Sequence, residues 1–377
     1  MHWHRFAAMA RKEFIQIRRD WRSLVIVVAM PVVLLLLFGY GVTLDIKRVP
    51  ICVYDREASQ ASRDLLERFS ASEYFSVARV ADNYPAIVQA IDAGRCKMAI
   101  VVPHDFSRRL SAGKQASVQA LVDATDDNTA NVIASYAEAV VRGFQEEVQR
   151  DWLRRQGQKK APLPLRVESR AWFNEDLESK AFIIPGVVAI VMAVIGTFLT
   201  SLTIAREWER GTMEQLISTP VTSLEIMLGK LVPYFLIGMF DTALCAAVAI
   251  GWFQIPFRGQ LVTLFAASAL FLTVVLSLGF FMSVVAKSQL AASQAALIST
   301  FLPAFLLSGF LFAIEQMPAA LQVFTRVIPA RYYVALLKKV FLKGSPFELL
   351  QAELLPLGAF AGVLMVVATR AFHKRLS

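Results

Sequence analysis

Six stretches of the chain are apolar for about the length that crosses a lipid bilayer. They lie at about residues 23–42, 182–204, 231–253, 260–285, 291–313 and 350–370. A helix of about 20 apolar residues covers the roughly 30 Å hydrocarbon core of a membrane. We therefore predict six transmembrane helices, the first at residues 23–43 and the other five within residues 181–377.

Residues 44–180 follow a different pattern, in which short β-prone runs alternate with segments of helical periodicity. Strands are expected at residues 49–55, 96–103 and 117–124, and helices at residues 62–72, 85–93 and 128–155. Strands that alternate with helices indicate an α/β unit. A polar, proline-containing linker at residues 156–166 leads back to the membrane. The predicted fold class is a mainly α membrane protein with six transmembrane helices and an inserted α/β domain.

The first 22 residues combine basic and apolar residues in the pattern of an amphipathic helix. The apolar side chains are Trp3, Phe6, Met9, Phe14 and Ile17, and the basic ones are Arg5, Arg11, Lys12, Arg18, Arg19 and Arg22. The apolar side chains can rest on a membrane while the basic ones meet anionic headgroups. We predict a cytoplasmic amphipathic helix at residues 1–22.

The composition agrees with a membrane protein. Hydrophobic residues make up 56% of the chain and charged residues 18%, whereas soluble domains have about 45–50% and about 25%. The formal net charge is +9, but acids and bases balance within residues 44–180, so the excess lies around the spans and not on a nucleic-acid surface. Lysine and arginine are more numerous in the flanks that share a side with the N-terminus. The positive-inside rule therefore places both termini in the cytoplasm and makes the α/β domain extracytoplasmic.

The chain has little of the chemistry that an enzyme or a metal site needs. Cys52, Cys96 and Cys245 form no CxxC motif and no cluster with histidine. Cys52 and Cys96 could pair in an oxidising compartment, but we expect two unpaired buried thiols. The sequence contains no Walker motif and no nucleophile–base signature. Asp126 and Asp127 are interpreted as a turn and helix N-cap rather than a cation site.

A charged, helix-prone segment lies between the second and third predicted spans. Glu207, Arg210 and Glu214 fall on one face of a helix wound at about 100° per residue. We predict an amphipathic helix at residues 204–220, which rests on lipid headgroups or docks into a partner. Gly211 within it weakens the helix by about 1 kcal/mol relative to alanine.

The sequence AREWERGTMEQLISTPV at residues 205–221 resembles the cytoplasmic coupling segment of permease subunits of ABC-2 type exporters. In that family the segment sits in a groove of the ATP-binding subunit and transmits the ATPase cycle to the membrane helices. The residues to which the resemblance assigns this coupling are Glu207, Trp208, Glu209, Arg210, Gly211, Thr212, Glu214, Thr219 and Pro220.

A second resemblance to the same family covers residues 306–344, which are too polar for a span and too apolar for an ordinary loop. Family members carry SGF, then MP, then a proline followed by an aromatic pair, then LKG. The matching residues are Ser308, Gly309, Phe310, Met317, Pro318, Gln322, Pro329, Tyr332, Tyr333, Leu342, Lys343 and Gly344. We expect external re-entrant or interfacial helices at residues 314–344. Ala313 and Lys338 depart from the family, where proline and arginine are common.

The resemblance extends over the whole chain and implies a permease subunit with no ATP site, cofactor or metal of its own. ATP and Mg would be bound by a separate cytoplasmic ATPase. The other implied partners are a second permease copy or sister permease, a periplasmic adaptor protein and the lipid membrane. The implied function is export of small hydrophobic or amphipathic, drug-like compounds across the bacterial inner membrane. A lipid or polysaccharide exporter is the alternative in the same class, and a membrane receptor without transport is the alternative in another.

Asp241 is an acidic residue in the middle of a predicted apolar span. A charge in the middle of a bilayer costs a few kcal/mol, so such a side chain normally faces a partner or a polar path. A cationic substrate, proton linkage and a helix–helix hydrogen bond all fit, and we treat Asp241 as a possible residue of the transport path. Lys287, at a predicted inner boundary, is expected to extend toward the headgroups.

Overall fold

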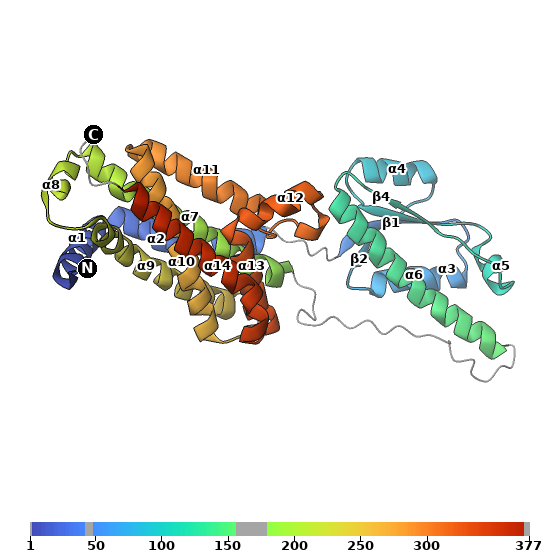
Figure 1. The fold of residues 1–377 in the computed structure, drawn as a ribbon. Coiled ribbons are helices and arrows are strands. Elements are labelled where there is room, and N and C mark those ends of the chain that lie inside the picture. Colours follow the sequence, from blue (N-terminus) through green and yellow to red (C-terminus); the bar gives the residue numbers. More distant parts are fainter. Residues whose placement is uncertain (1, 42–47, 156–178, 373–377) are drawn as a thin grey trace. The chain divides into compact units, whose positions relative to one another are not determined.

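The chain folds into two compact units (Figure 1). The residues that the computed structural model describes are 2–41, 48–155 and 179–372. The membrane unit comprises residues 1–43 and 170–377, and the α/β unit comprises residues 44–169. The predicted linker at residues 156–166 lies outside the described residues.

The membrane unit is built from long helices, which are apolar except for the amphipathic α1. They are α1 (Trp3–Arg19), α2 (Trp21–Gly41), α7 (Ser179–Glu209), α9 (Ser223–Ala247), α10 (Leu261–Ala286), α11 (Gln289–Leu307) and α14 (Phe347–Ala371). Five of them, α7, α9 with its π-helical extension to Trp252, α10, α11 and α14, are long and apolar enough to cross a membrane. The apolar part of α2 at Val27–Gly41 is shorter. The fold class, a mainly α membrane protein, is confirmed.

Helix α7 lies at the centre of the membrane unit, where it packs against α2, α9, α10 and α11. Its approach to α10 is close because Gly279 of α10 lies against the Thr197 carbonyl and the Thr200 hydroxyl, where a Cβ would have no room. The two threonine hydroxyls donate to carbonyls one turn earlier, those of Ala193 at 2.8 Å and Gly196 at 2.9 Å. The two hydroxyls are thereby hydrogen-bonded within α7 and need no partner from a neighbouring helix.

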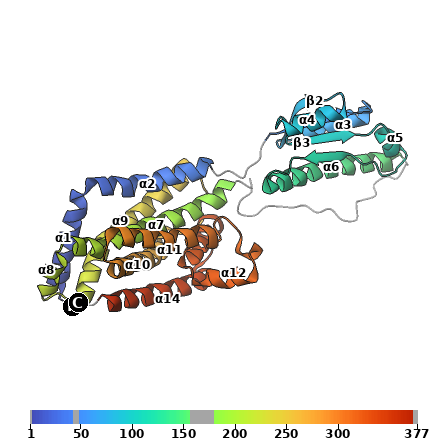
Figure 2. The same ribbon diagram turned by 90° about the horizontal axis from the view of Figure 1, so that it is seen from above.

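Different helices lie at the two ends of the membrane unit. Figures 1 and 2 show α1, α8 (Met213–Ser218) and the end of α14 together at one end, which we call the α8 end. They show α12 (Ala319–Phe324) at the opposite end, which we call the α12 end. The first helix and the end of the last helix of the described chain therefore meet at the same end of the bundle.

Residues 314–344 are divided into short helices. These are the 3-10 helices Ile314–Gln316 and Thr325–Val327, α12, α13 (Pro329–Lys338) and the π-helical turn Lys339–Lys343. Helix α13 is inserted among α7, α10 and α14, where Tyr333 and Leu336 are fully buried. Helix α12 exposes Leu321, Val323 and Phe324. Helix α13 thus belongs to the core, while α12 has the apolar surface of an interfacial helix.

The α/β unit contains a four-stranded sheet with strand order β2-β1-β3-β4. Its elements are β1 (Val49–Asp55), α3 (Gln60–Ala71), β2 (Phe75–Val80), α4 (Tyr84–Asp92), β3 (Met98–Val102), α5 (Phe106–Ser111), β4 (Gln119–Val122) and α6 (Asp127–Arg155). Strand β1 is parallel to β2 and β3, and β4 is antiparallel to β3. Helices α3, α5 and α6 contribute to the core on one face of the sheet, around Ile51 and Ile100, and α4 covers the other face with Ile87.

The sequence pattern predicts neither β2 nor α5. Strand β2 is at the edge of the sheet, and its side chains after Phe75 are exposed. Its sequence therefore lacks the apolar alternation of a half-buried strand. Helix α5 has only 6 residues, which is too short for helical periodicity to be recognised.

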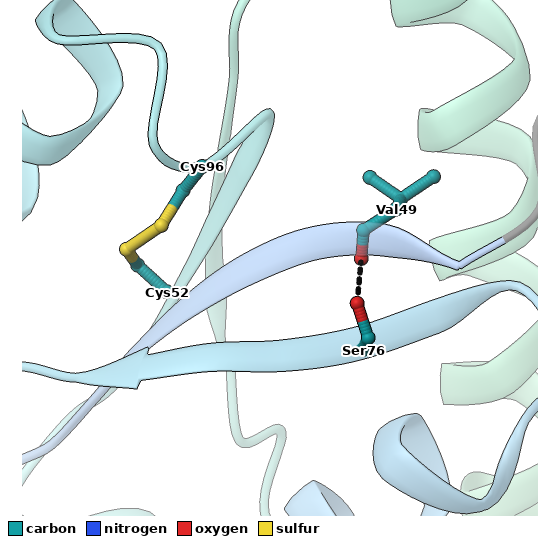
Figure 3. Close-up of a disulfide and its surroundings, with 4 residues drawn as sticks. All are labelled: Val49, Cys52, Ser76 and Cys96. Atoms are coloured by element: carbon teal, nitrogen blue, oxygen red, sulfur yellow. Dashed lines mark hydrogen bonds between the residues drawn. A yellow bond between two sulfur atoms is a disulfide. The ribbon is translucent and has the colours of Figure 1, made fainter.

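Cys52 and Cys96 form a disulfide, so the expectation of two unpaired thiols is wrong (Figure 3). Cys52 lies on β1 and Cys96 precedes β3, and their Cα atoms are 5.7 Å apart. The parallel register of the two strands brings cysteines 44 residues apart in sequence to the face that α4 covers. In the chain-entropy description, a disulfide that closes a loop of this length contributes about 4 kcal/mol.

Candidate coupling site

The predicted helix at residues 204–220 is two helices in the structure, which corrects that prediction. Helix α7 continues to Glu209, the chain turns at Gly211, and α8 follows. Gly211 has φ +67°, a left-handed conformation that glycine adopts without the steric cost of a Cβ. The turn is closed by the amide of Thr212, which donates to the Glu207 carbonyl at 3.0 Å, and by that of Gly211, which donates to Trp208 at 3.1 Å. This is the usual glycine-terminated end of a helix.

The break places Glu207 inside the protein rather than on a polar stripe with Arg210 and Glu214. Glu207 is only 6% exposed, and its Oε1 accepts from the Lys230 ammonium of α9 at 3.1 Å. The same Oε1 accepts from Lys12 of α1, also at 3.1 Å. The Thr212 hydroxyl donates to the other carboxylate oxygen. Glu207 therefore holds α7 to two other helices.

Lys230 is the centre of this buried network. Its side chain is 1% exposed, and it donates to Glu13 of α1 at 3.0 Å as well as to Glu207. The Tyr234 hydroxyl, one turn further along α9, donates to the second Glu13 oxygen at 3.1 Å. Two carboxylates and two ammonium groups thus balance in charge, and Lys12 is the member that reaches solvent. We refer to Lys12, Glu13, Glu207, Lys230 and Tyr234 as the basal network.

Helix α1 also holds the chain that follows α8. The Arg5 guanidinium donates to the Pro220 carbonyl at 2.6 Å. The amide of His2 donates to Glu225 at 2.5 Å. Glu225 is at the same time half of a capping box with Thr222, which starts α9. The N-terminal helix therefore contacts both ends of the turn between α8 and α9.

Helix α8 has a buried side and an exposed side. Met213 and Leu216 belong to the apolar core of the membrane unit. Arg210, in the turn before the helix, and Glu214 on it are exposed. Thr219 ends the helix, and its hydroxyl donates to the Leu216 carbonyl at 2.6 Å. Helix α8 therefore exposes one side to solvent while its opposite side is anchored in the core of the membrane unit.

The remaining predicted coupling residues contact the junction between α10 and α11. Glu209 accepts from the Gln289 amide at 2.7 Å, at the first residue of α11. Trp208 is half-buried, and the Lys287 ammonium lies 4.9 Å from its ring centroid. Lys287 had been expected to extend toward headgroups, but a cation–π contact with Trp208 is what the structure has. The end of α7 is thereby tied to α10 and α11 as well.

Glu13, Lys230 and Tyr234 are the site residues that sequence reasoning missed. Glu13 and Lys230 are 217 residues apart, so no local pattern connects them. One signal was available: Glu13 is the only acid among the first 19 residues, in a helix otherwise rich in arginine and lysine. An isolated acid of that kind, on the same helix face as Met9, is a candidate for an internal ion pair.

Asp241 faces the interior of the bundle. Its side chain is 3% exposed, and its Oδ1 has no hydrogen-bond partner among the described residues. It lines a small cavity between α7, α9 and α10, together with Tyr234, Gly238 and Leu272. A buried carboxyl of this kind keeps an unmet capacity for a proton or a cation.

The motif of residues 306–344 comes together at the α12 end. Gly309, with φ +79°, turns the chain so that Phe310 packs against Gly186 of α7. Lys338 of α13 donates to the Gly309 carbonyl at 2.8 Å. Ser308 is buried there, and its hydroxyl has no hydrogen-bond partner among the described residues. The turn is thus attached to both α7 and α13.

The aromatic pair of the motif has two separate contacts. Tyr333 stacks on Phe271 of α10 with centroids 4.2 Å apart, and its hydroxyl is 2.7 Å from that of Ser268. The Tyr332 hydroxyl donates to the Arg326 carbonyl at 2.9 Å. The other motif residues start or close short elements: Met317 and Pro318 precede α12, Gln322 donates to the Met317 carbonyl, Pro329 begins α13, and Gly344 ends the π-helical turn.

The described residues contain no group of His, Cys, Asp and Glu that could hold a metal ion. Comparison with known proteins matches residues 21–370 to the family model of ABC-2 family transporter proteins. The chain is 40% identical over 346 residues to the probable multidrug ABC transporter permease YbhS of Escherichia coli (strain K12), covering 92% of this chain and 90% of that protein. It is 28% identical to the probable multidrug ABC transporter permease YbhR of the same organism, over 99% of both chains. The inner membrane transport permease YhhJ, also from that strain, is 29% identical over 87% of this chain and 86% of its own length.

Proposed function

This chain belongs to the ABC-2 family of transporter proteins and is the permease subunit of an ABC exporter, and we propose that a separate cytoplasmic ATPase drives it by binding at α8. The chain is a multi-pass membrane protein and a transport subunit rather than an enzyme. The observation that supports the proposed site is that the α8 region has one exposed side and one buried side. Arg210 and Glu214 are exposed for a partner, while Met213 and Leu216 are anchored in the core.

Movement of α8 would reach the spans through contacts on three sides. The Gly211 turn joins α8 to α7, and the Thr222 capping box joins its far end to α9. Arg5 connects the same segment to α1. Glu207 and Lys230 of the basal network then hold α7, α9 and α1 together, so these three helices would respond to the ATPase as one body.

We propose the remaining parts by analogy with the family. ATP and Mg are bound by the partner ATPase, and the permease works as a dimer with itself or a sister permease. The substrates are small hydrophobic or amphipathic compounds, in keeping with relatives that are named multidrug permeases. Both termini face the cytoplasm of a bacterium, and the α/β unit lies outside the inner membrane. Its disulfide supports this location, since disulfides persist in oxidising compartments. An adaptor protein is its proposed partner.

Asp241 is proposed to lie on the transport path. Its carboxyl is buried on α9 and lines a cavity whose other walls include α7, the helix that ends at the coupling site. A change in the position of α7 relative to α9 would therefore alter the surroundings of this carboxyl.

The test is a pull-down of the tagged full chain from native membranes in a gentle detergent, with partners identified by mass spectrometry. The test variant is R210E/E214K, which exchanges two exposed charges near α8 and keeps the net charge. Glu207 is unsuitable because its replacement would disturb the basal network. The matched control is R326E/E348K, which makes the same exchange at exposed positions outside the α8 region.

We expect wild type and control to retain an ATPase with Walker motifs and the R210E/E214K variant to lose it. If all three retain the ATPase equally, the binding site lies elsewhere. If wild type retains none, the proposal of a separate driving subunit fails.

A further inference from the structure

Helix α1 and the end of α7 enclose a strongly basic hollow. Its lining residues are Ala8, Arg11, Lys12, Ile15, Gln16, Arg19, Asp20, Arg206 and Arg210. Five of these are basic and one is acidic. Apart from Lys12, which pairs with Glu207, none of the basic residues forms an ion pair with a carboxylate of the described chain. The hollow therefore has an excess of positive charge, which the single carboxylate of Asp20 offsets only in part.

An apolar cavity of about 320 Å³ continues from this hollow. It lies between α1, α2, α7 and α9, and its walls are Ile17, Val27, Met30, Val194, Ile195, Phe198, Leu199, Leu202, Tyr234 and Ile237, with Asp20 and Arg206 at its polar edge. Its size is within the range of about 300–1,000 Å³ of small-molecule sites. Asp20 and Arg206 line both spaces, so the basic hollow and the apolar cavity adjoin.

Another face of α1, away from the hollow, has the character of a membrane interface. Trp3 and Phe14 of α1 and Trp21 at the start of α2 are exposed at 68%, 53% and 65%. At 100° per residue Trp3 and Phe14 lie about 20° apart on α1, and Trp21 begins α2 after the break at Asp20. Tryptophan and other aromatic residues prefer the headgroup level of a bilayer. We therefore expect α1 to lie at headgroup level, which places the basic hollow along it at that depth and the apolar cavity toward the acyl chains.

A basic mouth that leads to an apolar cavity at headgroup level matches one kind of ligand. We propose that this crevice binds an anionic phospholipid of the surrounding bilayer, with its phosphate among Arg11, Arg19 and Arg206 and part of an acyl chain in the cavity. The zwitterionic headgroup of phosphatidylcholine carries a cation that the same arginines repel, so the site selects for net negative charge.

The bound lipid would contact the basal network directly. Tyr234 lines the apolar cavity, and its hydroxyl donates to Glu13. Arg206 is on the same turn of α7 as Glu207. The lipid is therefore placed to stabilise the packing of α1 on α7 and α9, independently of whether the ATPase is bound.

The experiment is native mass spectrometry of the delipidated full chain in detergent. Equal amounts of phosphatidylglycerol and phosphatidylcholine with identical acyl chains are added, and glycerol phosphate is tested separately as the free headgroup. The variants are R11Q/R19Q for the hollow and Val194→Phe to fill the cavity. R258Q/R326Q removes two exposed arginines elsewhere and is the matched control.

We expect the wild type and R258Q/R326Q to bind phosphatidylglycerol at least tenfold in preference to phosphatidylcholine, and R11Q/R19Q to lose about tenfold in binding. Val194→Phe should weaken lipid binding while glycerol phosphate binds none of the proteins detectably. Equal binding of the two lipids by wild type, or equal losses in R11Q/R19Q and R258Q/R326Q, would overturn the proposal. Binding of glycerol phosphate as strong as that of the lipid would show an anion site without a lipid. None of these readouts depends on transport or on the ATPase.

Discussion

The α8 end and the α12 end of the membrane unit both carry a family motif, and each fixes α7 by a different kind of contact. At the α8 end, buried charges join α7 to α1 and α9 through Glu207 and Lys230. At the α12 end, aromatic side chains fix α7. Phe310 packs against Gly186 of α7, and Tyr333, which is stacked on Phe271 of α10, donates from its hydroxyl to Met192 Sδ of α7 at 3.2 Å. Charge networks depend on the pairing of their buried members, whereas apolar packing depends on volume. The two ends should therefore fail for different reasons.

The largest effect is expected from removing the central charge of the basal network. Lys230→Met leaves Glu13 buried without an ammonium partner and Glu207 with Lys12 alone, so we expect a loss of about 3–5 kcal/mol in the free energy of unfolding. Thermal unfolding in detergent measures it. Lys12→Met is the control, because Lys12 is half exposed and an exposed pair contributes about 0–1 kcal/mol. Equal effects of the two substitutions would show that burial of the network contributes nothing.

A volume change should matter most at the α12 end. Gly186→Ala places a methyl group against the ring of Phe310, which is 2% exposed, so overpacking is expected to cost about 1–3 kcal/mol. The double variant G186A/F310L should recover part of the loss, because the smaller side chain makes room. The same unfolding measurement at low and high salt should give the same cost. A cost that changes with salt would mean that charge, not volume, governs this end.

The smallest effect is expected from deleting one hydroxyl at the α12 end. Tyr333→Phe keeps the stacking on Phe271 and loses the hydrogen bond to Ser268. The Ser268 hydroxyl also donates to the Leu264 carbonyl, so it remains satisfied, and the expected loss is about 0.5–1.5 kcal/mol. If Tyr333→Phe is as costly as Lys230→Met, the contrast between the two ends is wrong.

The parts that were predictable from the sequence are those that local patterns determine. Apolar runs of bilayer length mark the spans because each run is continuous, and the sequence around Gly211 identifies the coupling segment. The conformation there was mistaken, because the helical periodicity of Glu207 and Glu214 continues across a glycine that ends the helix. Reading that glycine as a C-terminal signal would have separated α7 from α8.

The contacts that could not be predicted join residues distant in sequence. Glu13 reaches Lys230, and Cys52 reaches Cys96, only because helices and strands pack in a particular register. Strand β2 was missed for a related reason. This segment is a strand because it pairs with β1, and its exposed side chains give no sequence pattern that would predict the pairing. In each case the contact is determined by how distant segments pack, and the local sequence gives only a weak signal of that packing.

Because α7 is long, its fixed contact with α10 determines how the two ends of the helix can move. The helix has 31 residues, and at 1.5 Å per residue it is about 46 Å long. Gly279 holds it about two thirds of the way along, at Thr197 and Thr200, where the two backbones are too close to accept a larger residue. A stiff helix that is fixed at one internal contact tilts about that contact. When the Glu209 end is pushed toward one side, the Ser179 end moves to the other. The Ser179 arm of about 20 residues is about twice as long as the Glu209 arm of about 10, so the displacement at Ser179 is about twice as large.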